Sequence, residues 1–124
     1  MDSGMLKPLQ QAAVEALGLG ENWFDKLNGH YEKRQEKAIE LLRLFGCEIQ
    51  KPDAGMFLWA GIPTSFENGQ IFSEFLLDEF GIFVPPGMVF GSAGDRFVRM
   101  SLCSPISIFE ECISKVHSKL RRHV

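Results

Sequence analysis

One arginine in the last third of the chain has the setting of an anion-binding group. Arg99 lies in the segment Phe97–Leu102, whose sequence Phe-Val-Arg-Met-Ser-Leu predicts a strand. Strand side chains alternate between two faces, so Val98 and Met100 should meet the core while Arg99 lies on the other face. A guanidinium is costly to bury unpaired, and its fork of donors fits a carboxylate or phosphate. The spacing allows anion binding, but by itself it favours the structural alternatives, which are a local Asp or Glu partner or extension into water.

Other catalytic patterns are weak. The sequence contains no Gly-x-Ser-x-Gly, P-loop or dinucleotide glycine motif. The glycines of the loop Gly87–Gly94 are more typical of turns than of a phosphate cradle. The three cysteines and three histidines are dispersed, which predicts free thiols in a reducing compartment and no metal site. No carboxylate pair has the spacing of an acid–base couple, so we expect no catalytic residue of that kind.

Four segments have the periodicity of helices. The first is predicted over residues 7–17, and the second from an Asn22 N-cap to Gly46. The third is predicted over residues 69–80, and Gly81 should end it. Ser107-Ile-Phe-Glu110 reads as a capping box that opens the last helix.

Strands are predicted between these helices. Cys47–Gln50 could form a short edge strand, and the apolar run Met56–Ile62 predicts a strand buried on both faces. Ile82–Val84 and Phe97–Leu102 are the other candidates. The expected fold class is α/β (α+β): a small mixed or antiparallel sheet of three to four strands, covered by helices and preceded by two N-terminal helices. A doubly wound sheet is disfavoured because no helix joins the last two strands.

Composition excludes several classes of protein. The chain has 124 residues, of which 45% are hydrophobic and 23% charged, as expected for one globular domain rather than a disordered chain. The net charge of −3 argues against a nucleic-acid or anionic membrane surface as partner. No apolar run reaches the ~20 residues of a spanning helix. The first residues lack the features of a signal peptide, so we expect a cytoplasmic protein.

Several motifs together resemble those of class I/II (fold-type I) pyridoxal-phosphate aminotransferases. Ala54-Gly-Met-Phe-Leu-Trp59 resembles the family's Ala-Gly-x-Phe-x-Trp element. Glu79-Phe-Gly-Ile-Phe-Val-Pro-Pro-Gly-Met-Val-Phe-Gly91 resembles its element of a glycine, three apolar residues and Pro-Gly-x-x-Phe-Gly. Phe97-Val-Arg-Met-Ser-Leu102 resembles the family's arginine strand. Pro8–Leu17 is similar to the helix that enters the small domain. The motifs occur in the family's order and spacing over nearly the whole chain.

The resemblance implies the C-terminal, small domain of such an enzyme. Residues 1–20 would be a junction segment and short helix from the large-domain boundary, and residues 21–124 the small domain. It implies pyridoxal 5'-phosphate for the parent enzyme, although no lysine here has the family's Ser-Lys-x-x-x-x-x-Gly-x-Arg setting for a Schiff base. It implies that Arg99 binds the substrate α-carboxylate. The stretch with Ser3 and Gly4 resembles one near the partner subunit's active site, and no cofactor-binding residue is assigned.

The expected function is therefore that of an aminotransferase fragment in amino acid metabolism. The parent would transfer an amino group between an amino acid and a 2-oxo acid, with Arg99 as the contribution of this chain. The chain alone should be inactive. The alternative is a stand-alone module that binds a small carboxylate or another protein without catalysis. The expected partners are the missing large domain and a second copy in a homo-oligomer such as a dimer, because residues such as Met5, Leu6 and Trp59 could leave an apolar patch uncovered.

Overall fold

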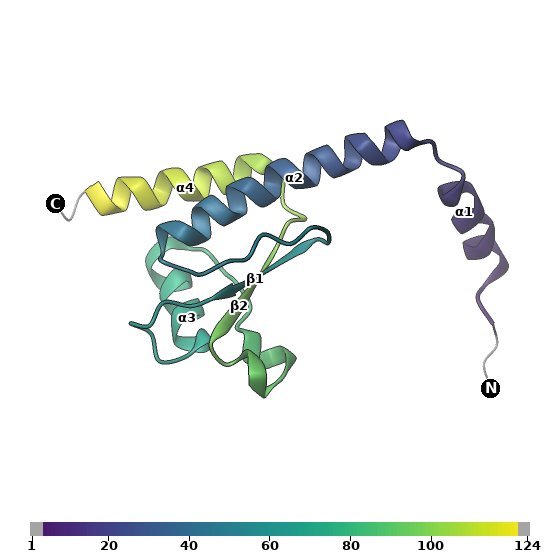
Figure 1. The fold of residues 1–124 in the computed structure, drawn as a ribbon. Helices are drawn as coiled ribbons and strands as arrows, with labels where there is room; N and C mark the ends of the chain where they lie inside the picture. Colours follow the sequence, from purple (N-terminus) through teal and green to yellow (C-terminus); the bar gives the residue numbers. More distant parts are fainter. Residues whose placement is uncertain (1–3, 122–124) are drawn as a thin grey trace. The chain divides into compact units, whose positions relative to one another are not determined.

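The computed structural model of the chain describes residues 4–121. These residues divide into two compact units, with the boundary between His30 and Tyr31. The first unit holds α1 (Lys7–Leu17) and the start of α2 (Glu21–Leu44). The second holds the rest of α2, two strands, α3 (Gly69–Phe80), two short 3-10 turns and α4 (Ile106–Arg121) (Figure 1).

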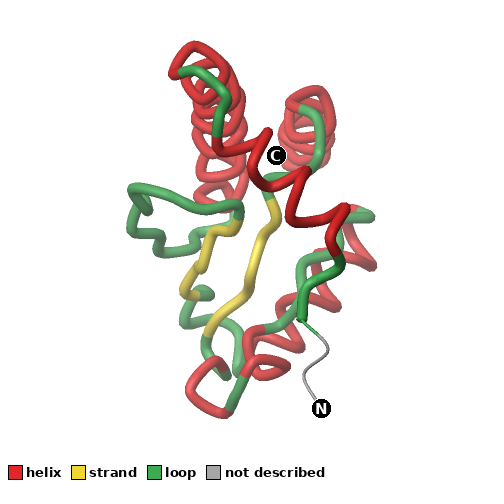
Figure 2. Tube along the Cα trace, turned by 90° about the vertical axis from the view of Figure 1, so that its right-hand side faces the viewer, coloured by secondary structure: helices red, strands yellow, loops and turns green. Residues whose placement is uncertain are grey.

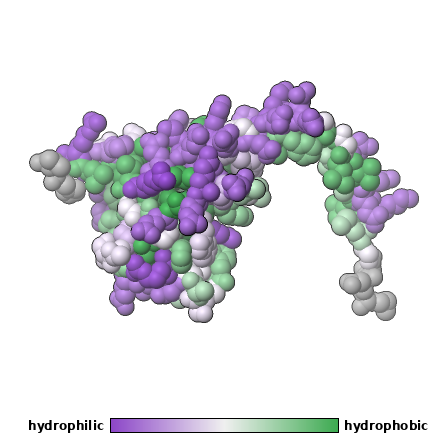
Figure 3. Space-filling model, in the orientation of Figure 1, coloured by the Kyte–Doolittle hydropathy of each residue, from purple (hydrophilic) through white to green (hydrophobic). Residues whose placement is uncertain are grey.

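The first unit is helical, and its apolar side chains are at the surface. The bounds of α1 are those predicted, with Pro8 in the first turn, but none of its residues is buried. Trp23 and Phe24 contact each other edge to face and are both exposed. Figure 3 shows this hydrophobic surface on the first unit. The prediction that Asn22 caps α2 is wrong, because the helix begins at Glu21 and Asn22 lies in its first turn.

A two-stranded antiparallel sheet is the centre of the second unit. β1 (Phe57–Gly61) pairs with β2 (Phe97–Ser101), with Leu58 opposite Met100 and Ala60 opposite Val98. Figure 2 shows the two strands side by side. Those four side chains are buried, and their neighbours along each strand are exposed or half-buried. The predicted alternation in β2 is confirmed. The prediction that Met56–Ile62 is buried on both faces is wrong, because Phe57 and Trp59 are exposed.

The mixed α/β class is confirmed, but the sheet has two strands rather than the predicted three to four. Glu48, in the predicted edge strand Cys47–Gln50, makes an isolated bridge to Gly61. The predicted strand Ile82–Val84 does not form a ladder, and the chain next to it meets β2 through a bridge between Pro86 and Val98. Prolines at positions 85 and 86 provide no backbone N–H, so they cannot extend a ladder there.

Three helices cover the buried face of this sheet. The part of α2 after Tyr31 and α4 lie next to each other, and α3 packs near β2 (Figures 1 and 2). The core is apolar and includes side chains from every one of these elements: Leu41, Leu42, Leu58, Phe72, Leu76, Val98, Phe109 and Val116. Because one face of the sheet is covered by helices, the charged and aromatic side chains of β1 and β2 are left on the opposite face.

The helix ends are partly as predicted. Gly81 ends α3 in the left-handed conformation with φ of 66°, and Gly46 follows α2 with φ of 81°, as expected. Asn68, which the sequence analysis did not identify, caps α3 by accepting a hydrogen bond from the N–H of Ile71 at 3.0 Å. The capping box at Ser107 is wrong, because α4 begins at Ile106 and Ser107 lies within its first turn.

The three cysteines are free, with Cys47 buried in the core and Cys103 exposed. Burial raises the pKa of the Cys47 thiol to about 12.

No helix of the described residues combines the length and the hydropathy that crossing a bilayer requires.

Candidate functional site

The site lies on the uncovered face of the two-stranded sheet. β2 places Phe97, Arg99 and Ser101 on this face, and β1 places Phe57 and Trp59 beside them. Trp59 stands directly opposite Arg99 in the register. The neighbouring positions in both strands are apolar and buried, so the register that fills the core also fixes the arginine on the open face.

The Arg99 guanidinium is held without a polar partner. It is half-buried, and no residue from 4 to 121 accepts a hydrogen bond from it or forms an ion pair with it. Its carbon Cζ lies 4.3 Å from the centre of the Phe57 ring and 3.9 Å from the centre of the Phe90 ring. Such cation–π contacts contribute about 0.5–1 kcal/mol when exposed and ~2 kcal/mol when desolvated. The expected alternative of a local acidic partner is therefore not realised among the described residues.

Another arginine nearby has a structural role instead. The Arg96 guanidinium donates to the carbonyls of Pro63 at 3.1 Å and Glu67 at 2.9 Å, and also to that of Phe66. These bonds hold the connection between β1 and α3. These bonds occupy N–H donors of Arg96 that a ligand would need, whereas the corresponding donors of Arg99 stay available.

An aromatic cluster surrounds the arginine. The rings of Trp59 and Phe97 stack at 5.5 Å between centroids, and Trp59 meets Phe90 edge to face at 6.0 Å. Phe57, Trp59 and Phe90 each keep more than two fifths of their surface exposed. We define these four aromatic residues, Phe57, Trp59, Phe90 and Phe97, as the aromatic cluster.

A glycine loop brings Phe90 to this position. The loop consists of the 3-10 turns η1 (Gly87–Phe90) and η2 (Ser92–Gly94). A Cβ atom at Gly87 would lie 2.4 Å from the Gly94 carbonyl oxygen and 2.9 Å from Trp59 Cη2. The loop is thus packed backbone to backbone beside the end of the sheet. Its glycines permit this close approach. The turns that the sequence predicts here are present as η1 and η2.

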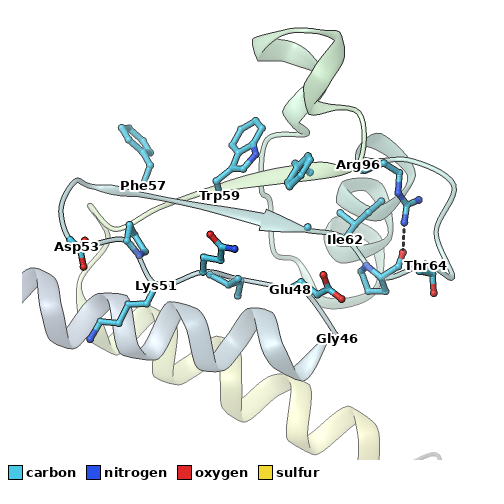
Figure 4. A pocket seen from close by; sticks show the side chains of 15 residues that line it. Gly46, Glu48, Lys51, Asp53, Phe57, Trp59, Ile62, Thr64 and Arg96 are labelled. Atoms are coloured by element: carbon cyan, nitrogen blue, oxygen red, sulfur yellow. Dashed lines mark hydrogen bonds between the residues drawn. The ribbon is translucent and has the colours of Figure 1, made fainter.

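A groove borders the site along β1. It has a volume of about 1060 Å³, and its walls include Phe57, Trp59 and Phe97 of the aromatic cluster. The opposite wall is the segment from Gly46 to Asp53, which Gln35 holds by donating to the Pro52 carbonyl at 3.0 Å. In the view of Figure 4, the rings of Phe57 and Trp59 project upward from β1, and this segment runs below the strand.

The residues present do not fit pyridoxal phosphate as a cofactor site. Lys51 lines the groove, but its side chain extends away from the rings of Phe57 and Trp59 and lies 4.0 Å from Glu32 (Figure 4). Lys37, Lys115 and Lys119 form ion pairs on helix surfaces with Glu40, Glu111 and Glu79. Among residues 4–121, no group of three or more His, Cys, Asp or Glu side chains could hold a metal ion.

The two predicted site segments belong to different units, Ser3 and Gly4 to the first and Arg99 to the second. Gly4 is exposed with φ of 57°, and Ser3 lies outside the described residues. Sequence reasoning identified Arg99 but missed Phe57 and Phe90 as its contacts. The period-two pattern of Phe57 and Trp59 could have placed both beside Arg99, whereas nothing in the sequence indicates how the loop folds back with Phe90.

Fold and site together define a small α/β domain that presents, on an open sheet face, an arginine without a polar partner among residues 4–121. The chain belongs to the family described as aminotransferase class I and II, whose model matches residues 3–112. It is 37% identical over 95% of its length to LL-diaminopimelate aminotransferase of Gloeobacter violaceus, and 33% identical over 94% to that of Dehalococcoides mccartyi. In each case it spans about 30% of the relative's length.

Solved structures agree with this assignment. The substrate-bound structure of BacF from Bacillus subtilis superposes with a TM-score of 0.77 at 34% identity, covering 93% of this chain and 30% of that one. The aromatic aminotransferase from Pyrococcus horikoshii OT3 gives a TM-score of 0.76 at 27% identity, covering 92% and 31%. The expected family membership is confirmed.

Proposed function

We propose that these residues form the small domain of a pyridoxal-phosphate-dependent aminotransferase and that Arg99 binds the α-carboxylate of its substrate. The observation that supports this most directly is the Arg99 guanidinium, which is half-buried on an open face and has no polar partner among the described residues. A carboxylate can accept two parallel hydrogen bonds from such a fork.

The reaction of the whole enzyme is the transfer of an amino group between an amino acid and a 2-oxo acid. The curated relatives act within amino acid metabolism, as LL-diaminopimelate aminotransferases. In this reaction Arg99 binds and orients the substrate, since a fixed carboxylate restricts where the neighbouring carbon can lie. We place the cofactor in parts of the enzyme other than residues 4–121, because no lysine described here has the family's Schiff-base sequence setting and three of them form ion pairs on helices.

The chain by itself should therefore neither transaminate nor bind pyridoxal phosphate covalently. The test is an absorbance spectrum of the 124-residue chain with added pyridoxal phosphate, followed by borohydride reduction and mass spectrometry. We expect no lysine adduct near a 1:1 ratio. A stoichiometric adduct on one particular lysine would contradict the proposal, whereas scattered substoichiometric labelling of exposed lysines would agree with it.

The partners of the domain follow from its exposed apolar groups. Met88 and Val89 in η1 are 46% and 69% exposed, and Met5 and Leu6 in the first unit 64% and 67%. Exposed groups of this kind favour contact with another protein surface. We propose a large domain of the same enzyme and a second copy of the chain as these partners, in a cytoplasmic homo-oligomer such as a dimer. Ser3 and Gly4 would then belong near the partner subunit's active site.

A second function is supported by the same open guanidinium. A stand-alone module that binds a small carboxylate, or a protein through one, needs nothing beyond the groups of this chain. The two proposals differ in what the gene encodes upstream. A continuous reading frame with a Ser-Lys-x-x-x-x-x-Gly-x-Arg motif supports the aminotransferase, and a gene without one supports the module.

A further inference from the structure

The unusual feature of the site is the way in which Arg99 is held. Most half-buried arginines are fixed through hydrogen bonds, as Arg96 is by three carbonyls. The Cζ atom of Arg99 instead lies over two aromatic rings, 3.9 and 4.3 Å from the ring centres. A cation over a ring is attracted by the ring's electron-rich face, and this attraction uses none of the N–H donors.

The two rings come from separate elements of the fold, a strand and a loop. Phe57 is at the start of β1 and diagonal to Arg99, because its own partner in the register is Ser101. Phe90 ends η1, where it also meets the edge of Trp59. Trp59 in turn stacks on Phe97, the residue two positions before Arg99. The Arg99 side chain is therefore contacted by rings whose positions are set by the sheet register and by the glycine loop.

We infer that Phe90 and Phe57 are positioning residues, which order the Arg99 guanidinium by stacking and leave its donor edge available for a carboxylate. This inference rests on the proposed function of Arg99. A free arginine side chain has several rotatable bonds, and a ligand that must order it binds more weakly. Ordering through the ring faces avoids that cost without occupying the hydrogen-bond donors.

Phe90 is the better residue to change. Its side chain is 48% exposed and no part of the buried core, so its replacement should leave the domain folded. Phe90→Leu keeps an apolar side chain but removes the π face, whereas Phe90→Trp restores one. Ser92→Ala is a matched control in the neighbouring turn of the same loop, because Ser92 is exposed and has no ring to place over Arg99.

The experiment uses the whole 124-residue chain, with ¹⁵N-labelled arginine and pyruvate as the carboxylate probe. Sodium chloride at equal ionic strength is the control for non-specific screening. The Arg99 Nε–Hε signal reports the order of the side chain without ligand and its shift on addition of pyruvate. Isothermal titration calorimetry gives the dissociation constant for pyruvate in every variant, including those that lack Arg99. Arg99→Gln identifies the signal and should weaken pyruvate binding by about tenfold or more.

We expect Phe90→Leu to lower the order of Arg99 Nε–Hε and to weaken pyruvate binding by about threefold to thirtyfold. Phe90→Trp should restore both, and Ser92→Ala should change neither. In the Arg99→Gln background, Phe90→Leu should have no further effect. If Phe90 acted only by packing, Phe90→Leu would leave the order of Arg99 and pyruvate binding nearly unchanged, and any remaining loss would be the same with and without Arg99.

The outcomes separate the two proposals. Wild-type binding of pyruvate that Phe90→Leu leaves unchanged would overturn the positioning role and leave the carboxylate role of Arg99 standing. Absence of a pyruvate-dependent shift at Arg99 in the wild-type chain would overturn the proposed carboxylate role, and the positioning role with it.

Discussion

Gly87→Ala tests whether the close packing of the glycine loop holds the site together. The new Cβ would lie 2.4 Å from the Gly94 oxygen, 2.9 Å from the Phe97 oxygen and 2.9 Å from Trp59 Cη2. Ordinary contacts of a Cβ begin near 3.4 Å, so the nearest atom must move by about 1 Å. Two of the three atoms belong to the backbone and cannot rotate away. The loop or the end of β2 must therefore shift.

Overpacking of this kind costs about 1–3 kcal/mol of unfolding free energy. We expect urea unfolding, followed by far-ultraviolet circular dichroism, to show a lower midpoint with an unchanged slope. The fluorescence of Trp59 should also change, because its ring contacts the glycine directly. Ser92→Ala is the control, since Ser92 is exposed in the same loop and its loss should alter stability by less than about 0.5 kcal/mol.

The displacement should reach the site as well. Phe90 ends the turn that Gly87 begins, so a shift of η1 moves the ring away from the Arg99 guanidinium. A Gly87→Ala chain as stable as the wild type, with an unchanged Trp59 signal, would refute the reasoning that this backbone approach is tight.

Three further predictions concern the rest of the domain. Asn68→Ala should lower the unfolding free energy by about 0.5–2 kcal/mol in urea titrations, because the Ile71 N–H loses its cap, whereas Asn68→Ser should retain most of the stability. For Cys47, burial raises the folded-state pKa from 9.0 to about 12, so the unfolded chain loses its thiol proton first and stability should fall as the pH rises from about 9 to 12. Cys47→Ala should lessen that fall, and an equal fall in both chains would contradict it. The exposed apolar groups of the first unit and η1 should cause self-association, and light scattering that shows a monomer at high concentration would count against it.

Much of the helical structure could be predicted from local patterns. The bounds of α1 and α3, and the glycines that follow α2 and α3, agree with periodicity and end signals because both act within a few residues. The capping box at Ser107 failed for a related reason. The motif places the start of the helix after Ser107, whereas α4 already begins at Ile106, directly after Pro105, and buries Phe109. Strand predictions were weaker, since Cys47–Gln50 and Ile82–Val84 depend on partners that local sequence does not specify.

The sequence by itself determined that Arg99 lies on the face of β2 opposite the core, because alternation is a property of any strand with three buried apolar neighbours at every second position. Tertiary structure alone decided what surrounds it. Phe57 reaches Arg99 through the register of the sheet, and Phe90 through a loop that folds back where two glycines let backbones meet. Contacts between residues far apart in the chain depend on how the elements pack, so the ring-bound, unpaired state of the guanidinium could be recognised only from the fold.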